Sequence, residues 1–422
     1  MTHVKILHTS DWHVGKVLKG QSRHDEQVAV LREIVELARA EQPDLVIVAG
    51  DLFDTAAPGA RATRLVTRAL SGLRRTGAEV VAIAGNHDNG AALDALRHWA
   101  EAAGITLRGT IRGIDDHLIT GTTRAGEPWR LVALPFLSQR YAVRAVEMFD
   151  LTGAEANQEY TTLVTRLLER LTHSFDARAI NLITAHLTVL GGALGGGERA
   201  AQTILSYAVP ATAFPASAHY VALGHLHRQQ KITGPAPTYY SGSPLALDFG
   251  EEENTPGVLL VEVTPDTPAR VRSVPITSAL PLRTVRGTLA ELTEYARTLR
   301  TDQRSASTDG AADTGAAARS TGSVGVPDDH QRSSEPWLRV FVRERPRAGL
   351  REEVQELLPR ALEVRIDPEL LEKTQQREPR TRRAGRSASE LFADYLRARG
   401  HDDPEVRELF DQLYADLEVT ES

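Results

Sequence analysis

Short apolar runs alternate with amphipathic segments along the first part of the chain. Runs at residues 4–7, 45–49 and 80–84 are each bounded by glycine or polar residues, which indicates buried β-strands. Between them, residues 27–40 and 62–75 show the apolar spacing of helices. The order strand, helix, strand, helix, strand predicts an α/β fold with a mostly parallel sheet.

Polar side chains follow the predicted strands directly. Further apolar runs at residues 182–185, 220–223 and 258–263 predict three more strands, and two of these are also followed by histidines. Ligands of open α/β sheets gather at the carboxyl ends of the strands, so we expect these side chains at one edge of one sheet. They are Asp11, His13, Asp51, Asn86, His186, His225 and His227.

This set of side chains predicts a metal centre. Carboxylate, amide and imidazole ligands, in a chain without cysteine, favour Mn, Fe or Zn over Ca or a purely Mg site. The set is large enough for two divalent ions about 3.5–4 Å apart, with Asp51 as the natural bridge. Such a pair clamps a phosphoryl group and orients a bound water for in-line attack. Taken singly, an Asp or Asn after a strand is more often a cap or turn residue, and a single His an ordinary polar residue.

Composition favours an intracellular enzyme. The chain has 422 residues, 41% of them hydrophobic, which is enough for two or three domains. No apolar run approaches the roughly 20 residues of a membrane span, and the polar start is no signal peptide, so we expect a cytoplasmic protein with no membrane contact. The net charge of −7 is unusual for a DNA-binding protein, but bound metals would add positive charge where a phosphate sits.

The order of the motifs along the chain resembles that of a known family. Asp-x-His, Gly-Asp-x-x-Asp, Gly-Asn-His-Asp, a single His after a strand, and Gly-His-x-His resemble the calcineurin-like metallophosphoesterase superfamily. Within it, residues 8–13, 50–54, 222–227 and 241–244 are similar to the bacterial SbcD nucleases. The resemblance covers roughly residues 1–276 and implies a metallophosphoesterase sandwich of sheets flanked by helices.

The resemblance also implies a role for each site residue. One metal ion would be held by four side chains: Asp11, His13, Asp51 and His227. The second would be held by Asp51, Asn86, His186 and His225, which makes Asp51 the shared ligand. His87 is then left to act on the scissile phosphate, by protonating the leaving oxygen or stabilising charge, with Asp88 orienting it and Asp54 supporting the site.

The pattern of predicted helices and strands changes after residue 276. Helix patterns at residues 289–299 and 350–362 and a strand pattern at 337–342 predict a small α+β domain over 277–370, which the resemblance implies caps the nuclease. Within it, residues 302–335 have almost no large apolar side chains, so we expect a flexible insertion there. Residues 371–386 form a basic linker that contacts DNA or is simply solvated.

Two amphipathic helices are predicted over residues 387–422, the first opening with a capping box. The resemblance favours their docking on SbcC, an ABC-type ATPase, over packing on the nuclease domain. The glycine-rich segment Gly191–Gly197 lacks the lysine of a phosphate-binding P-loop, so we expect a mobile loop beside His186 that contacts substrate.

We therefore predict a metal-dependent DNA nuclease with two divalent ions, Mn²⁺ being favoured. By resemblance it would act as endonuclease and 3'-5' exonuclease at DNA ends and hairpins, with an SbcC ATPase, in DNA repair, replication and recombination. It would form a homodimer within a heterotetramer. The alternatives are a metallophosphoesterase acting on small phosphodiesters or phosphoproteins, and a nuclease-silent scaffold for the ATPase.

Overall fold

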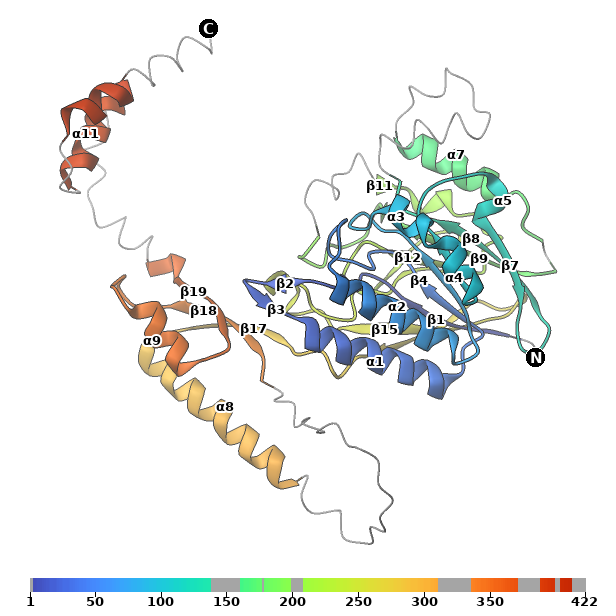
Figure 1. The fold of residues 1–422 in the computed structure, drawn as a ribbon, viewed down its shortest axis with the longest axis horizontal. Coiled ribbons are helices and arrows are strands. Elements are labelled where there is room, and N and C mark those ends of the chain that lie inside the picture. The colour runs from blue at the N-terminus through green and yellow to red at the C-terminus, as the bar shows by residue number, and fades with distance from the viewer. Residues whose placement is uncertain are drawn as a thin grey trace.

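The computed structural model describes residues 3–137, 160–176, 178–198, 208–309, 335–370, 388–398 and 403–411. Two six-stranded sheets form its largest part (Figure 1). The first sheet has the order β16-β15-β1-β4-β5-β6, in which β15 and β16 join by antiparallel pairing and the other pairs are parallel. Its strands are β1 (Val4–Thr9), β4 (Leu45–Val48), β5 (Glu79–Ile83), β6 (Ile105–Arg108), β15 (Gly257–Val263) and β16 (Arg270–Pro275).

The second sheet has the order β13-β14-β12-β9-β8-β7 and is parallel except at its two outer pairs. Its strands are β7 (Leu118–Thr122), β8 (Pro128–Leu134), β9 (Ile180–His186), β12 (Tyr220–Gly224), β13 (Gln230–Ile232) and β14 (Thr238–Tyr240). Side chains of both sheets, such as Ile47 and Leu182, share one buried cluster, so the two sheets pack face to face. The fold is the expected metallophosphoesterase sandwich.

The expectation of a single sheet is wrong, although every predicted strand is confirmed. Strands β9 and β12 belong to the second sheet, whereas β1, β4 and β5 belong to the first. The reason is that both faces of these strands are apolar and buried. A run without alternation shows that a strand is central but does not show which sheet contains it.

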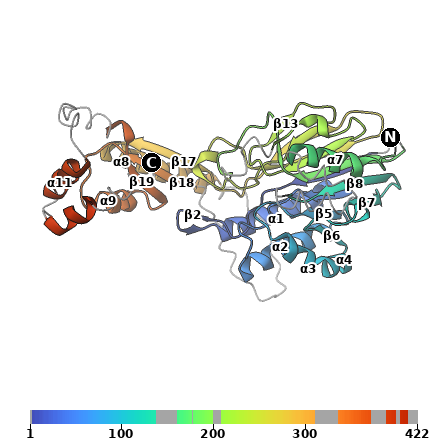
Figure 2. The ribbon, with the colours of Figure 1, turned by 90° about the horizontal axis from the view of Figure 1, so that it is seen from above.

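Helices cover the outer faces of the sandwich. Helices α1 (His24–Glu41) and α2 (Ala60–Arg74), which confirm the two predicted helices, pack with strands of the first sheet in one apolar cluster. Helix α7 (Tyr160–Thr172) packs on the second sheet. Figure 2 shows α2, α3 and α4 on one side of the sheets and α7 on the other. The short elements are β2 (Val17–Leu18), β3 (Gln21–Ser22), α3 (Gly90–Ala95), α4 (Arg97–Ala102), α5 (Ile114–His117), β10 (Thr188–Val189), β11 (Ala208–Val209), η3 (Ala211–Ala213) and η4 (Phe249–Glu251).

A smaller unit follows the sandwich. Strands β17 (Leu282–Gly287), β18 (Trp337–Val342) and β19 (Ala361–Ile366) form a parallel sheet that shares its own apolar cluster with α8 (Leu289–Asp309) and α9 (Leu350–Leu357). The predicted strand 337–342 is confirmed. The predicted helix 350–362 ends at Leu357, because Pro359 disfavours the helical conformation of the residue before it.

The expected start of the flexible insertion at residue 302 is wrong, because α8 continues to Asp309. A helix that is already nucleated adds residues at little cost, even where none of them has a large apolar side chain. Residues 310–334 lie outside the described part of the chain, and so does the predicted basic linker at 371–386.

Two helical segments stand at the C-terminal end. They are α11 (Ala388–Ala398) and residues 404–411, and they meet through the stacked rings of Phe392 and Phe410, 4.1 Å apart between centroids. Both views place α11 apart from the two large sheets (Figures 1 and 2). Among the described residues, no helix is both long and apolar enough to cross a membrane.

Candidate metal centre

The ends of five buried strands meet in one place. Asp11 and His13 follow β1, Asp51 follows β4, and Asn86 follows β5, all in the first sheet. From the second sheet, His186 ends β9, and His225 and His227 follow β12. The polar side chains therefore converge where the carboxyl ends of the strands of two facing sheets come together. All seven predicted ligands lie there and are buried, except Asn86, which is half-buried.

The backbone at this edge is held in a strained conformation. Asp11, His13 and Asp51 have positive φ values of 54°, 45° and 51°. Few residues other than glycine adopt this region, and it persists where neighbouring structure fixes it. Two backbone bonds do so: the Asp11 N–H donates to the Gly50 carbonyl and the His13 N–H to the Asp51 carbonyl, both at 3.0 Å. The strain is concentrated at the candidate ligands.

Glycine precedes two candidate ligands because their neighbours come very close. A Cβ atom at Gly50 would lie 2.2 Å from Nδ1 of His186, and one at Gly85 would lie 2.1 Å from Oδ1 of Asp51. Any larger residue would push these side chains away. Gly50 therefore lets the second sheet approach the first at His186, and Gly85 lets the loops after β4 and β5 lie close together.

One group of candidate ligands consists of Asp11, His13 and His227, whose ligand atoms lie within 4.8 Å of one another. Both ring nitrogens of His13 are buried, and neither has a hydrogen-bond partner within the described residues. Leaving a buried polar group unsatisfied costs about 1–3 kcal/mol. Burial lowers the pKa of His13 to about 4, so the ring is neutral and its lone pair is available. These features fit a metal ligand.

A second group consists of Asp11, Asp51 and His186, again within 4.8 Å. Oδ2 of Asp51 lies 3.4 Å from Nε2 of His13 and 3.5 Å from Nε2 of His186, between the two groups. Burial alone would raise the pKa of Asp51, but His186 and His13 outweigh it and lower that pKa. Asp51 is thus a charged carboxylate in the position of a bridge.

Asn86 completes the second group. Its Oδ1 atom lies 2.9 Å from Nε2 of His186 and 2.8 Å from Nδ1 of His225. The Nδ1–H of His186 donates to the Ala49 carbonyl at 2.8 Å, which leaves Nε2 facing Asn86 and Asp51. An amide oxygen and imidazole nitrogens thus converge on the same space as Asp51, which is how ligands surround a divalent cation.

Glu251 supports this site and was not predicted from the sequence. Its Oε1 lies 2.6 Å from Nδ1 of His227, and its Oε2 accepts the Leu247 N–H at 2.8 Å. Burial acts to lower the pKa of His227, but the bond to Glu251 outweighs it and raises the pKa to about 9. Glu251 is 1% exposed while its neighbours Glu252 and Glu253 are exposed, and nothing in the sequence separates the three.

The glycine-rich segment lies over His227. Glu198 accepts the His227 N–H at 2.9 Å and the Gly196 N–H at 2.8 Å. A Cβ at Gly197 would lie 1.9 Å from Oε1 of Glu251, so only glycine fits there. Gly191–Gly197 is expected beside His186, but Gly195 and Gly197 place the end of this segment against His227 and Glu251.

His87 lies beside the first group. Its backbone N–H donates to Oδ1 of Asp51 at 2.8 Å, and its Nδ1–H donates to the Asp54 carbonyl at 2.8 Å. Its ring is 4.5 Å from the ring of His13 between centroids. The bond to Asp54 fixes the ring orientation and leaves Nε2 as the basic nitrogen.

Asp88 joins two of the loops. Its carboxylate accepts the backbone N–H groups of Leu52 at 3.1 Å, Phe53 at 2.9 Å and Gly85 at 2.8 Å. Burial, and then the charge of Asp51, raise the pKa of Asp88 to about 7. These bonds hold the loop after β4 against the loop after β5. Asp88 therefore fixes the positions of Asp51 and His87 relative to each other through the backbone.

Comparison with known proteins places these residues in a family. The sequence model of the calcineurin-like phosphoesterase family matches residues 4–229, a range that contains every candidate ligand and ends before Glu251. The SbcD subunit of the SbcCD nuclease of Bacillus subtilis is 37% identical over 283 residues, covering 66% of this chain and 71% of that protein. The SbcD protein of Rhodobacter capsulatus is 37% identical over 298 residues, covering 66% and 71%. That of Escherichia coli is 33% identical over 298 residues, covering 69% and 72%.

Proposed function

This chain belongs to the calcineurin-like phosphoesterase family and to its SbcD nucleases, and on that premise we propose that it hydrolyses DNA phosphodiester bonds with two divalent metal ions. The carboxylate of Asp51, between His13 and His186, is the observation that supports a two-metal centre most strongly. A bridging carboxylate flanked by imidazoles is what two ions about 3.5–4 Å apart require.

We assign the ligands in two sets that share Asp51. The first set is Asp11, His13, Asp51 and His227, and the second is Asp51, Asn86, His186 and His225. Mixed oxygen and nitrogen ligands without thiolate favour Mn, Fe or Zn, and of these we propose Mn²⁺. When bound, the ions would polarise the phosphoryl group and lower the pKa of a coordinated water. Glu251 would keep His227 oriented, as a partner on the far ring nitrogen of a metal ligand usually does.

His87 is assigned to the reaction rather than to metal binding. The Asp54 carbonyl and the backbone bond to Asp51 hold the ring beside the first ligand set. From there, the ring, once protonated at Nε2, would donate a proton to the leaving oxygen or hydrogen-bond to the charged phosphoryl oxygens. Asp88 would position His87 through the loop it joins to Asp51.

The partner is proposed to be an SbcC-type ABC ATPase, in a heterotetramer built on a homodimer of this chain. Support comes from the C-terminal helices, where Tyr395, Val406 and Leu409 are 54%, 40% and 55% exposed. Exposed apolar side chains on amphipathic helices suit a helix-in-groove contact with another protein. The unit of β17–β19, α8 and α9 would act as the capping domain, and DNA ends and hairpins would be the substrates of endonuclease and 3'-5' exonuclease activity.

The test is a cleavage assay on hairpin, duplex and single-stranded DNA with Mn²⁺, with and without the ATPase. We expect Mn²⁺-dependent cleavage that chelation abolishes, and an extended substrate range when the ATPase is present. Hydrolysis of a small diester such as bis(4-nitrophenyl) phosphate without any DNA cleavage would instead indicate a small-molecule phosphodiesterase. Binding to the ATPase without hydrolysis of either substrate would indicate a scaffold.

A further inference from the structure

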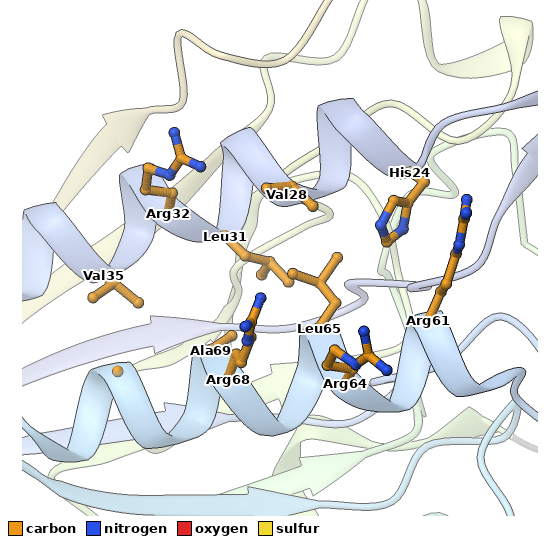
Figure 3. A pocket seen from close by; sticks show the side chains of 11 residues that line it. His24, Val28, Leu31, Arg32, Val35, Arg61, Arg64, Leu65, Arg68 and Ala69 are labelled. Atoms are coloured by element: carbon orange, nitrogen blue, oxygen red, sulfur yellow. The ribbon is translucent and has the colours of Figure 1, made fainter. Parts of the chain in front are cut away.

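A groove lined by arginines runs between helices α1 and α2 on the outer face of the first sheet (Figure 3). It encloses about 390 Å³. Its floor includes Leu31, Leu65 and Ala69, and its rim carries a histidine and four arginines. The rim residues are His24, Arg32, Arg61, Arg64 and Arg68. We call this feature the α1–α2 groove.

No acidic side chain is among the described residues that line the α1–α2 groove. Helix α2 contains no acidic residue, and Arg61, Arg64 and Arg68 form one stripe along it, about 10 Å long at 1.5 Å per residue. Within the described residues, none of the four rim arginines forms an ion pair. Other arginines on the same helices do: Arg39 pairs with Glu36, and Arg74 lies 3.5 Å from Glu79.

The groove starts next to the metal centre. Gln27, in the first turn of α1, donates to the carbonyl of His13 at 2.9 Å and accepts the Gly15 N–H at 3.1 Å. A Cβ at Gly15 would lie 3.6 Å from Cβ of Ala62, in the first turn of α2. Both helices thus begin against the backbone that carries His13. The rim runs from there away from the site, with Arg61 at the near end and Arg68 further along.

We propose that the α1–α2 groove binds the phosphate backbone of DNA on one side of the bond held at the metal centre. This inference rests on the proposed nuclease function. Guanidinium groups pair with phosphate oxygens, and a DNA strand presents a charge about every 3.4 Å, so the arginine stripe spans several phosphates. The rim offers no Asn or Gln to read a base edge, which suits binding that ignores sequence.

An acidic helix of a protein partner fits the groove less well. Such a helix needs pockets for apolar anchors along its contact face. Leu31, Leu65 and Ala69 are already buried by the packing of α1 on α2, so they offer little apolar surface to a third helix. The exposed guanidinium groups are the surface that remains. In a chain of net charge −7, such a local excess of positive charge is what attracts a polyanion.

The experiment compares two triple variants of the full chain by fluorescence anisotropy with a labelled DNA duplex, in chelator so that nothing is cleaved. The groove variant is Arg61→Gln, Arg64→Gln and Arg68→Gln. The matched control removes the same charge elsewhere, as Arg39→Gln, Arg178→Gln and Arg270→Gln. Arg178 and Arg270 are exposed residues near the starts of β9 and β16, at the opposite ends of the strands from the site.

We expect the affinity of the groove variant for duplex DNA to fall by about tenfold or more at moderate salt. The slope of log K against log salt concentration should also be smaller in magnitude by about 2 to 3, which is one unit per lost phosphate contact. The control should keep the wild-type affinity and slope. Circular dichroism melting, unchanged in both variants, would show that the helices are intact.

Wild-type affinity and slope in the groove variant would overturn the inference while leaving the nuclease proposal standing. So would a groove variant that binds DNA normally but no longer co-purifies with the ATPase, because the groove would then be a protein-binding surface. A wild-type chain that hydrolyses bis(4-nitrophenyl) phosphate but neither binds nor cleaves DNA would contradict the proposed function itself.

Discussion

The metal centre buries polar side chains, whereas the C-terminal helices expose apolar ones. Both are the reverse of what is usual in a folded protein. At the metal centre, His13 is 1% exposed and its ring nitrogens have no hydrogen-bond partner among the described residues. On the C-terminal helices, Leu409 is apolar and 55% exposed. A buried polar group without a hydrogen bond is costly, and so is an apolar surface in water. These two departures support the proposals that the first region binds cations and the second a protein surface.

The two regions also differ in how they are held. Candidate ligands follow strands of two packed sheets, and backbone bonds link the loops in which Asp11, His13 and Asp51 have positive φ. The two terminal helical segments contact each other through Phe392 and Phe410 and lie apart from the large sheets (Figure 1). Changes at the centre should therefore affect metal binding and chemistry, whereas changes in the terminal helices should affect association.

Asp51→Ala should have the largest effect, because it removes the proposed bridge between the two ligand sets. We expect loss of bound metal and a fall in DNA hydrolysis of about 10³-fold or more, as stabilisation of both the attacking and the leaving oxygens is lost. Metal content by mass spectrometry and single-turnover cleavage measure the two effects. A variant that retains both metals would rule out Asp51 as the bridge.

His87→Asn should separate catalysis from metal binding. Turnover should fall by about 10²-fold or more, the usual effect of losing an acid–base group, while two metals stay bound. The same two measurements apply as for Asp51. If the asparagine variant lost its metals, His87 would be a ligand; if it kept its rate, His87 would have no role in the reaction.

Glu251→Gln should weaken metal binding by about 10- to 100-fold, the usual effect of removing the partner of a liganding histidine. The control is Glu253→Gln, which changes the same charge at an exposed position two residues away. Titration of the chelated protein with Mn²⁺ gives the affinities. Equal affinities in the two variants would show that Glu251 does not support His227.

Removing residues 387–422 should have the smallest effect on chemistry, because every proposed ligand lies before residue 228. Metal-dependent cleavage of single-stranded DNA by the isolated chain should stay near the wild-type rate, while stable co-purification with an SbcC-type ATPase should be lost. Undiminished binding by the shortened chain would show that these helices pack on their own protein instead.

The order of the motifs predicted the candidate ligands because each follows a strand whose apolar run is easy to recognise. The same runs could not assign β9 and β12 to a second sheet, since a doubly buried strand shows no alternation. The role of Glu251 could not be predicted from the sequence for a different reason. It contacts His227 only through the folding of the chain, and in sequence it is one of three consecutive glutamates.

Metal stoichiometry tests the central claim most directly. The metal-free chain would be titrated with Mn²⁺ while bound metal and DNA cleavage are followed together. A two-metal centre predicts two bound equivalents per chain, with cleavage that recovers as the second site fills and no recovery with Ca²⁺. Full cleavage in excess chelator, or a full rate with a single equivalent bound, would contradict it.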